Sequence, residues 1–263
     1  MPHPVTAPAH DGDRHTVVLL HSLGTDRRLW RRQVPALSDA YEVLTPETRG
    51  HGEADWPGEA TLTGWVSDLD RVLQDRGPVH LVGLSMGGLQ AVAYAGTHPE
   101  KVRSLVVANS FARLPADVAE ARVQGAAEGI AAGMDAFAEQ YLAQTLTRVI
   151  DEEDHSALRG AIAAVHPGAY LSSVEVTFRA DVTPWFSLIA CPTLVVAGEH
   201  DHKAPLQRSQ EIADGIDGAA LEVVAGAGHL SCLENAGGFN KILTSFLGSV
   251  DAGLQKRHEE TPA

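Results

Sequence analysis

Six apolar runs rich in β-branched residues divide the chain into a regular alternation. They lie at residues 16–20, 42–45, 79–82, 102–108, 193–197 and 221–224, and segments with helical spacing separate them. Apolar residues occupy adjacent rather than alternating positions in these runs, as expected for strands that are buried on both faces. The alternation therefore predicts an α/β fold in which a mostly parallel sheet is flanked by helices.

The alternation stops between residues 112 and 190. This stretch is rich in alanine, carries charged residues at helical spacing and contains no strand candidate, so we interpret it as a helical insertion. Within it, Gly125, Gly129 and Gly133 recur every four residues. That spacing fits either a solvated Ala/Gly-rich helix or a stripe for close helix packing.

These patterns divide the chain into a core, an insertion and two polar ends. A chain of 263 residues can bury a sizeable apolar core. We expect coil at 1–15, the core at 16–111 and 191–249, the insertion at 112–190 and a flexible tail at 250–263.

Composition narrows the function class. The net charge is −14 and no run is rich in Lys or Arg, which argues against nucleic-acid binding because phosphate contacts need a basic surface. No apolar run approaches the roughly 18 residues of a membrane span, and the first residues lack the pattern of a signal peptide. We therefore expect no membrane partner and a cytoplasmic location.

The residue types that hold metals do not cluster in the sequence. Cys191 and Cys232 are far apart, and we expect both to be buried free thiols. The 13 histidines are scattered, and the densest group is EHDH at residues 199–202. Residues at i and i+2 need a strand or a special loop to converge on one ion, so we expect no metal there, and nothing in the sequence implies a cofactor.

The stretch VGLSMGG, at residues 82–88, has the pattern of a serine nucleophile. A Gly-X-Ser-X-Gly sequence alone occurs by chance in many proteins, but here an apolar strand precedes it and a helical pattern follows at once. In that context the glycines allow a turn that holds the serine hydroxyl at the carboxyl edge of the sheet. We therefore predict that Ser85 is a nucleophile.

A serine hydroxyl needs a base, and the base needs a group that orients it. Asp201 and His229 each lie in a loop after a predicted strand, in EHDHKAP and AGHLS. Parallel strands end at one sheet edge, so both residues can reach Ser85. The alternative acid is Glu199, which is still at the strand end, and the alternative role for His229 is that of an ordinary loop histidine.

Two backbone amides should bind the oxyanion of a reaction intermediate. Met86 directly follows the predicted nucleophile, and Leu23 lies in LLHSLGT after the first predicted strand. The alternative for this second segment is an ordinary turn between a strand and a helix.

Together these residues make the chain resemble the α/β-hydrolases with a helical cap. The resemblance rests on LLHSLGTDRRLW, TPETRGHGEA, LVGLSMGGLQAVAYAGTHPEKVRSLVVANS, CPTLVVAGEHDHKAP and GAGHLSCLENAGGFN, which cover the whole core. It implies that Ser85 is the nucleophile, Asp201 the acid, His229 the base, and Leu23 and Met86 the oxyanion amides. Relatives usually begin with a β-hairpin. Here only about 15 residues precede the first strand, so we expect that hairpin to be missing.

A narrower resemblance is to the 3-oxoadipate enol-lactonases, which have similar NSLGTDxxMW, DTRGHG, GLSMGG and LVLANT segments. Ser22 and Trp30 belong to this pattern, whereas the segment at 166–182 is only loosely similar. Ser85 argues against the dehalogenases and epoxide hydrolases of the family, which use aspartate. Leu230 argues against the carbon–carbon bond hydrolases, which usually place tryptophan there.

The resemblance implies a serine hydrolase that cleaves a small carboxylic ester or lactone, such as an enol-lactone, through an acyl-enzyme. A cofactor-free perhydrolase or haloperoxidase and a general carboxylesterase are alternatives within the enzymes. A small-molecule receptor built on the same fold is the alternative from another class. A homodimer is one hypothesis for the assembly.

An enol-lactone substrate carries a carboxylate, which an acidic protein repels unless a local cation compensates. Arg179 is our first candidate for that cation, because the following segment leads back into the core. Surface solvation is the ordinary role of any single arginine. The other arginines considered are Arg113, Arg122, Arg148 and Arg159.

Overall fold

The computed structural model describes residues 14–259. Its single sheet has six strands in the order β2-β1-β3-β4-β5-β6, and every neighbouring pair is parallel. Each strand overlaps an apolar run, which confirms the predicted α/β fold. The strands are β1 (Thr16–Leu20), β2 (Glu42–Leu44), β3 (Val79–Leu84), β4 (Val102–Ala108), β5 (Thr193–Gly198) and β6 (Ala220–Val224).

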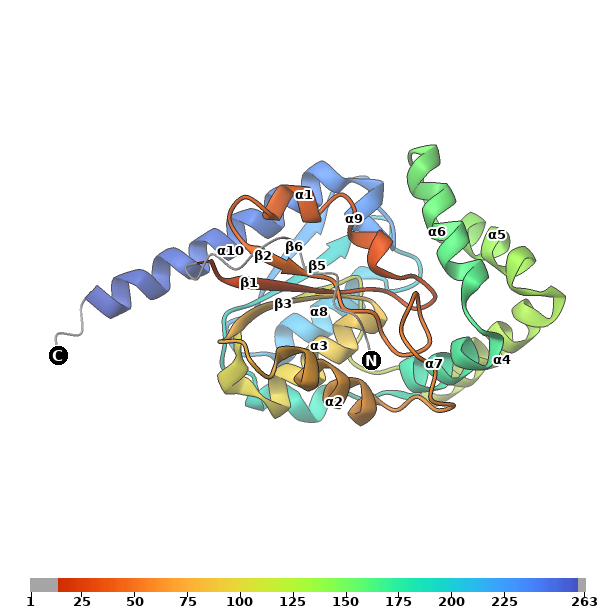
Figure 1. Ribbon diagram of the computed structural model, residues 1–263, viewed down its shortest axis with the longest axis horizontal. Helices are drawn as coiled ribbons and strands as arrows, with labels where there is room; N and C mark the ends of the chain where they lie inside the picture. Colours follow the sequence, from red (N-terminus) through yellow and green to blue (C-terminus); the bar gives the residue numbers. More distant parts are fainter. Residues whose placement is uncertain (1–13, 260–263) are drawn as a thin grey trace.

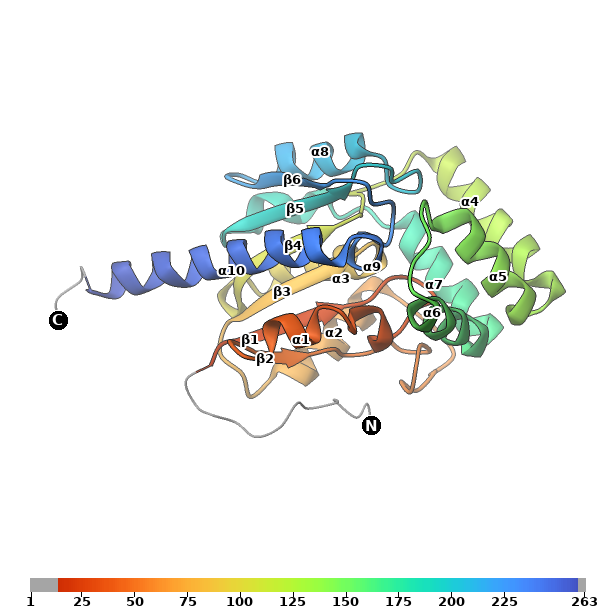
Figure 2. The same cartoon turned by 90° about the horizontal axis from the view of Figure 1, so that it is seen from above.

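The inner strands send alternate side chains to two apolar clusters on opposite faces of the sheet. In β1, Val17 and Leu19 belong to one cluster, and Val18 and Leu20 to the other. Because helices cover both faces, apolar side chains are favoured at successive positions of such a strand. One face is covered by α1 (Val34–Leu37) and α10 (Ala236–Glu259), and the other by α2 (Leu62–Leu73), α3 (Met86–Thr97) and α8 (Leu206–Gly215) (Figures 1 and 2).

The order of the strands places a switch point between β1 and β3. The chain continues from β1 to β2 on one side and then crosses to β3 on the other. Loops that leave two such strands diverge, and open α/β sheets bind their ligands at the carboxyl ends of these strands. The loops after β1 and β3 therefore lie where a site is expected.

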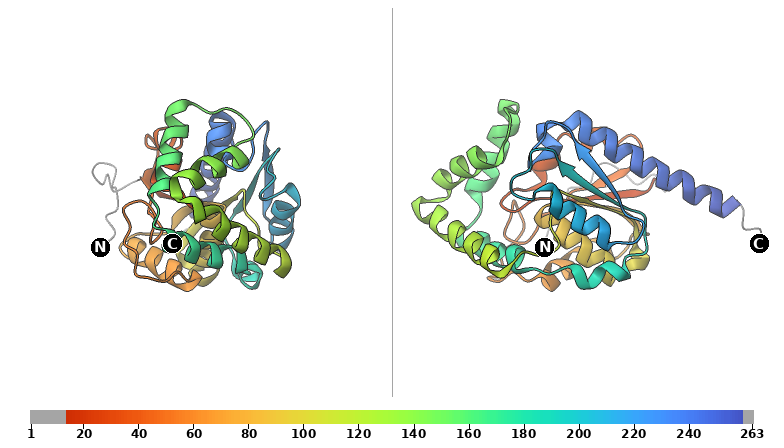
Figure 3. Two further views of the ribbon diagram at one scale, coloured as in Figure 1. Left: turned by 90° about the vertical axis from the view of Figure 1, so that its right-hand side faces the viewer. Right: turned by 180° about the vertical axis from the view of Figure 1, so that it is seen from behind.

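Four helices are inserted between β4 and β5. They stand beyond the carboxyl edge of the sheet, on one side of the molecule (Figures 1 and 3). The only sheet-like contact in this region is the isolated antiparallel bridge between Arg113 and Asp181. The helices are α4 (Ala116–Gly129), α5 (Met134–Thr145), α6 (Glu152–Ala164) and α7 (Pro167–Arg179).

The three regularly spaced glycines do not form one packing face. Helix α4 ends at Gly129, and Gly133 lies beyond it with φ 95°. A Cβ on Gly125 would meet no heavy atom within 4 Å, whereas one on Gly129 would lie 3.0 Å from the Phe137 ring. The first glycine is therefore a solvated helix position, and only the second lies close to another side chain.

Helix α10 continues beyond residue 249, where we expected the core to end. Phe239, Leu243, Leu247 and Val250 recur on it at helical spacing and are buried, which explains why this face stays helical. Residues 1–13 and 260–263 lie outside the described part, so it covers the expected N-terminal coil only at residues 14 and 15.

Within residues 14–259 every strand pairing in the sheet is parallel, and the segment where a hairpin was expected to be missing lies almost wholly outside the described residues. None of the helices described is both long enough and apolar enough to cross a bilayer.

Candidate active site

Ser85 lies in a tight turn between β3 and α3. Its backbone has φ 56° and ψ −113°, a combination that non-glycine residues rarely adopt. A Cβ on Gly83 would lie 2.1 Å from the carbonyl oxygen of Gly87, and one on Gly87 would lie 2.2 Å from that of Leu20. Only glycine fits at either position, so the sequence pattern reflects close backbone contact among β1, β3 and α3.

Hydrogen bonds to its backbone hold Ser85 in this conformation. Its N–H donates to the carbonyl oxygen of Ala108 at 2.8 Å. Its own carbonyl oxygen accepts from the Gly88 N–H and from the Ser110 hydroxyl, both at 2.8 Å. The turn is thus fixed from the end of β4 as well as from its own helix.

The structure brings together the three side chains that the sequence predicts to act together. The Oγ of Ser85 lies 3.0 Å from Nε2 of His229, and Nδ1 of His229 lies 2.9 Å from Oδ2 of Asp201. All three residues are buried, with at most 7% of their surface exposed. These distances are those of ordinary hydrogen bonds, so the histidine can receive the serine proton while the aspartate orients its ring.

The carboxylate of Asp201 has further donors. Its Oδ1 accepts from the backbone N–H groups of Lys203 and Ala204 at 2.8 and 2.9 Å, and its Oδ2 accepts from Nδ2 of Asn109 at 2.9 Å. Burial alone would raise the pKa of Asp201, but His229 and these donors outweigh it and hold the pKa below its usual value. Asp201 is therefore an anion at neutral pH.

Glu199, the alternative acid, lies elsewhere. Its side chain is exposed and accepts from the N–H of Gly226 at 2.7 Å. The geometry therefore favours Asp201 as the partner of His229. In the described residues, no group of three or more His, Cys, Asp or Glu side chains could hold a metal ion, and this includes EHDH at 199–202.

Asn109 is a site residue that the sequence reasoning missed. It directly follows β4 with φ 47°, and its N–H donates to the carbonyl oxygen of Val196 on β5 at 2.8 Å. Besides Asp201, its Nδ2 reaches the carbonyl oxygen of Gly228 at 3.1 Å. The signal available in the sequence was its place as a polar residue at the carboxyl end of a buried strand.

The loops that carry the acid and the base also touch through their backbones. A Cβ on Gly198, at the end of β5, would lie 2.1 Å from the carbonyl oxygen of Gly228. The N–H of His200 donates to the carbonyl oxygen of Ala227 at 2.8 Å. The positions of Asp201 and His229 are therefore fixed relative to each other by main-chain contact.

Leu23 and Met86, the predicted oxyanion residues, lie in segments that are in contact. Both residues are buried. Met86 begins α3, and a Cβ on the next residue, Gly87, would lie 2.8 Å from the carbonyl oxygen of His21 in the loop that carries Leu23. The loop after β1 thus runs along the first turn of α3, which is where two amides can converge on one oxygen.

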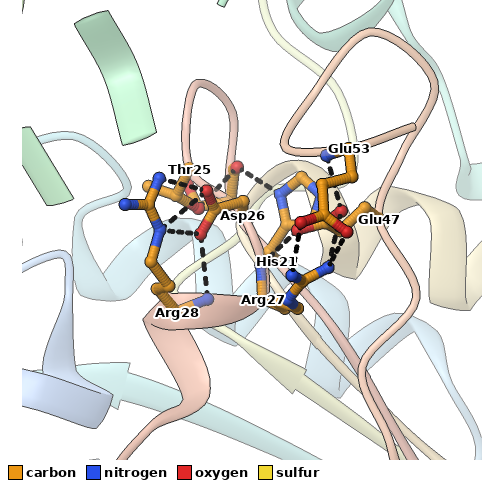
Figure 4. A network of polar contacts seen from close by, with 8 residues as sticks. His21, Thr25, Asp26, Arg27, Arg28, Glu47 and Glu53 are labelled. Carbon is orange, nitrogen blue, oxygen red and sulfur yellow. Dashed lines mark hydrogen bonds and ion pairs between the residues drawn. The ribbon is translucent and has the colours of Figure 1, made fainter. Parts of the chain in front are cut away.

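A buried histidine shapes this loop (Figure 4). Nε2 of His21 accepts from the N–H of Thr48 at 3.0 Å, so Nδ1 carries the proton and donates to the carbonyl oxygen of Ser22 at 2.9 Å. Burial lowers the pKa of His21, and burial together with the neighbouring His21 ring lowers the pKa of His51 to about 3. Both rings are neutral and fix the loop without adding charge.

Ion pairs hold the outer side of the same loop. Asp26 accepts from the backbone and the guanidinium of Arg28, and Arg27 binds Glu47 and Glu53 (Figure 4). Burial acts to raise the pKa of Asp26, but the hydrogen bonds from Arg28 outweigh it and the pKa is lowered. These contacts tie the segment after Leu23 to the loop that follows β2.

Aromatic side chains of the inserted helices lie against the loop that carries Leu23. A Cβ on Gly24 would lie 3.1 Å from the ring of Tyr170 on α7. The Phe137 ring on α5 lies 5.0 Å from the Tyr170 ring and 5.8 Å from the Tyr141 ring, measured between centroids. Helices α5 and α7 therefore provide an apolar cover beside the predicted oxyanion amides.

Glu234 joins the loop of His229 to the inserted helices. It is 4% exposed, and its Oε1 accepts from the N–H of Leu230, the residue after His229, at 3.1 Å. Its Oε2 accepts from the N–H and the hydroxyl of Thr147, at 2.9 and 2.5 Å. A single carboxylate thus connects the segment between α5 and α6 to the segment of the base.

The expectation for Arg179 is not supported by its surroundings. Its guanidinium is half exposed and forms ion pairs with Glu120 and with Glu175. A guanidinium held by two surface carboxylates has little capacity left for a substrate, so we correct that assignment. The position of the helix end along the chain did not reveal the direction of the side chain.

A cavity of about 440 Å³ lies apart from this site, between α2 and the loop after β2. Its lining includes Trp65, Leu69 and Gln90 but none of the three residues Ser85, Asp201 and His229. Two lining arginines, Arg49 and Arg71, both bind Asp68. The cavity has no contact with the reactive side chains, and we assign no chemistry to it.

Comparisons with known proteins agree with this architecture. A family model described as the alpha/beta hydrolase fold matches residues 15–236. The chain is 30% identical over 245 residues to 3-oxoadipate enol-lactonase 1 of Acinetobacter baylyi, a match that covers 89% of each chain. It is 28% identical over 249 residues to the pimeloyl-[acyl-carrier protein] methyl ester esterase of Neisseria meningitidis, covering 91% of this chain and 94% of the relative.

Solved structures give the same picture. The enol-lactonase from Burkholderia xenovorans superposes with a TM-score of 0.86 at 31% identity, covering 94% of this chain and 96% of that one. A bromoperoxidase from Bacillus anthracis superposes with a TM-score of 0.84 at 25% identity, covering 90% and 93%. The similarity in each case spans the core and the inserted helices together.

Proposed function

This chain belongs to the α/β-hydrolase family, and on that premise we propose that it is a serine hydrolase that cleaves a carboxylic ester or lactone through an acyl-enzyme. The observation that carries the proposal is the line of contacts from Ser85 Oγ to His229 Nε2, at 3.0 Å, and from His229 Nδ1 to Asp201, at 2.9 Å. The similarity to proteins named as lactonases and esterases supports it.

In this mechanism His229 acts first as a base and then as an acid. It takes the proton of Ser85 as Oγ attacks the carbonyl carbon, and Asp201 stabilises the charged imidazole. The amides of Leu23 and Met86 stabilise the oxyanion. When the intermediate collapses, His229 gives the proton to the leaving oxygen, and it then activates a water that releases the acid from Ser85.

We assign the helices α4–α7, within residues 112–190, to a cap over this site, and residues 16–111 and 191–249 to the catalytic core. Support comes from the contact of Tyr170 with the loop of Leu23 and from the bridge that Glu234 makes to Thr147. A cap of this kind limits the access of bulk solvent to the site and selects the substrate.

The replacement Ser85→Ala tests the nucleophile. We expect hydrolysis of p-nitrophenyl acetate to fall by about 10⁴-fold or more, because a lone nucleophile carries nearly the whole effect of its triad. The control Ser249→Ala removes an exposed hydroxyl on α10 and should leave the rate unchanged. Full activity of Ser85→Ala would refute the proposal.

The first substrate to test is 3-oxoadipate enol-lactone, because the chain is about 30% identical to enol-lactonases over most of its length. Parallel assays with simple p-nitrophenyl esters test a general carboxylesterase. Peroxide-dependent halogenation tests a perhydrolase, the second candidate, which the similarity to a bromoperoxidase favours. Acylation of Ser85 without turnover on any of these would instead indicate a small-molecule receptor.

A further inference from the structure

Two cations next to the site have no carboxylate partner of their own. Arg122 on α4 and Lys203 in the loop of Asp201 are both partly buried, and within residues 14–253 neither forms an ion pair. Of the other four arginines of the insertion, Arg148 is exposed to solvent, and the remaining three differ from Arg122. Arg113, Arg159 and Arg179 all pair with carboxylates at the surface.

The two cations lie beside each other. Nη2 of Arg122 donates to the carbonyl oxygen of Lys203 at 2.9 Å. The guanidinium carbon of Arg122 lies 5.4 Å from the centre of the Phe178 ring, and Nζ of Lys203 lies 4.6 Å from the centre of the Tyr141 ring. Aromatic faces and a carbonyl hold both groups in place, but they leave the positive charges without a counter-ion.

Lys203 connects directly to Asp201, and Arg122 reaches the same loop through the carbonyl oxygen of Lys203. The N–H of Lys203 donates to Oδ1 of Asp201 at 2.8 Å. Tyr141, which Lys203 covers, is also close to the site: burial raises its pKa to about 12, and the charge of Asp201 adds to this while Thr145 and Arg122 oppose it. The pair therefore lies between the loop of Asp201 and the inserted helices α4 and α5.

Positive charge is in excess around Arg122 and Lys203. Burial lowers the pKa of Arg122, and burial together with the charge of Arg122 lowers that of Lys203, against the attraction of Asp201. Asp201 is already bound to His229, and Arg208, a further positive neighbour of Arg122, has its own partner in Glu211. Two desolvated cations side by side are stabilised when an anion binds between them.

We propose that Arg122 and Lys203 form an anion subsite of the substrate pocket, which binds a carboxylate that takes no part in the reaction. This inference rests on the proposed function and narrows it to esters or lactones that carry a second, free carboxylate. The planar guanidinium offers two parallel donors to such a group, and the ammonium offers a third.

A matched pair of substrates tests the subsite. Mono-p-nitrophenyl glutarate and p-nitrophenyl pentanoate share the reacting ester and the chain length but differ in the terminal carboxylate. We expect the wild-type protein to favour the glutarate in kcat/KM. In Arg122→Gln and in Lys203→Met this preference should fall by about tenfold or more, mainly through KM of the glutarate. The control Arg159→Gln, at a surface ion pair, should keep it.

A binding measurement separates failure of the subsite from failure of the proposed chemistry. Glutarate itself, titrated by calorimetry into the Ser85→Ala protein, should bind, and binding should weaken about tenfold in Ser85→Ala with Arg122→Gln. Equal preference and equal glutarate affinity in the parent and in both cation variants would overturn the subsite. If every variant, including Ser85→Ala, still hydrolysed the esters, the proposed function would be overturned. The glutarate titration would then still decide whether the subsite exists.

Discussion

Asn109 and Asp201 are joined by a hydrogen bond of 2.9 Å at the ends of two neighbouring strands. The donor is the side-chain amide of Asn109, whose backbone has φ 47° and is itself bound to Val196 on β5. The proposed acid is thus held from β4 as well as from its own loop. Contacts other than the one with His229 therefore already orient the carboxylate of Asp201.

Replacing Asn109 should separate activity from stability. Asn109→Gly and Asn109→Ala both remove the bond to Asp201, so kcat/KM should fall about tenfold in each, as expected for one hydrogen bond to a charged group. Alanine also suffers the backbone strain of a positive φ, so its free energy of unfolding should be lower than that of the glycine variant by about 1 kcal/mol. Urea unfolding measures the second effect, and equal kcat/KM in all three proteins would contradict the positioning role.

The glycines around Ser85 should not tolerate alanine. Gly87→Ala places a Cβ 2.2 Å from a carbonyl oxygen of β1, so we expect a loss of about 3 kcal/mol or more in unfolding free energy. Gly125→Ala, in open space on α4, should instead stabilise the protein by about 0.5–1 kcal/mol. Thermal unfolding of the two variants compares them, and similar melting temperatures would show that the turn can relax.

Glu234→Gln should weaken the connection between the cap and the loop of His229. The amide of glutamine has only one acceptor oxygen, so it cannot accept from both Leu230 and Thr147, and one buried donor loses its partner. We expect a loss of about 1–3 kcal/mol in unfolding free energy and a lower kcat. Glu152→Gln, an exposed glutamate on α6, is the matched control and should stay within about 0.5 kcal/mol.

The buried His51 should make the protein less stable in acid. Its pKa is about 3 in the folded protein and about 6.5 in an unfolded chain, so between these values the unfolded state binds more protons. Stability present above pH 6.5 is therefore lost as the pH falls toward 3, by about 2 kcal/mol between pH 6.5 and pH 5.

Urea unfolding at pH 7 and pH 5 checks this expectation. In His51→Gln the difference between the two pH values should shrink, whereas in His202→Gln, at an exposed position, it should match the wild-type difference. If His51→Gln kept the wild-type difference in unfolding free energy between pH 7 and pH 5, the His51 ring would not be the group responsible for it.

The strands and the meeting of Ser85, Asp201 and His229 were predictable because both depend on local pattern. Continuous apolar runs identify buried parallel strands, and residues just after such strands must meet at one edge of the sheet. That rule placed Ser85, Asp201 and His229 together. It could not reveal Asn109, whose partner Asp201 is 92 positions away and whose importance depends on the direction of one side-chain amide.

The roles of the arginines on the inserted helices were also hard to predict, because they too depend on the direction of a side chain. Arg179 and Arg122 both lie on helices with a similar mixture of charged and small residues, and nothing in the spacing shows which guanidinium faces the core. The difference appears only in three dimensions, where Arg179 is paired at the surface and Arg122 lies against Lys203. The sequence shows that both side chains are charged, but it does not show where each one points, so it could not distinguish the two arginines.

The backbone contacts at Gly83, Gly87 and Gly198 also bear on how such a chain can diversify. At each of these positions even one added carbon would meet a carbonyl oxygen at about 2 Å, and together they fix the loops that carry Ser85, Asp201 and His229. We therefore expect substitutions at these three glycines to be lost through misfolding before they can alter activity. Substitutions in the inserted helices, where positions such as Gly125 have open space around them, leave the fold intact and can change the substrate preference.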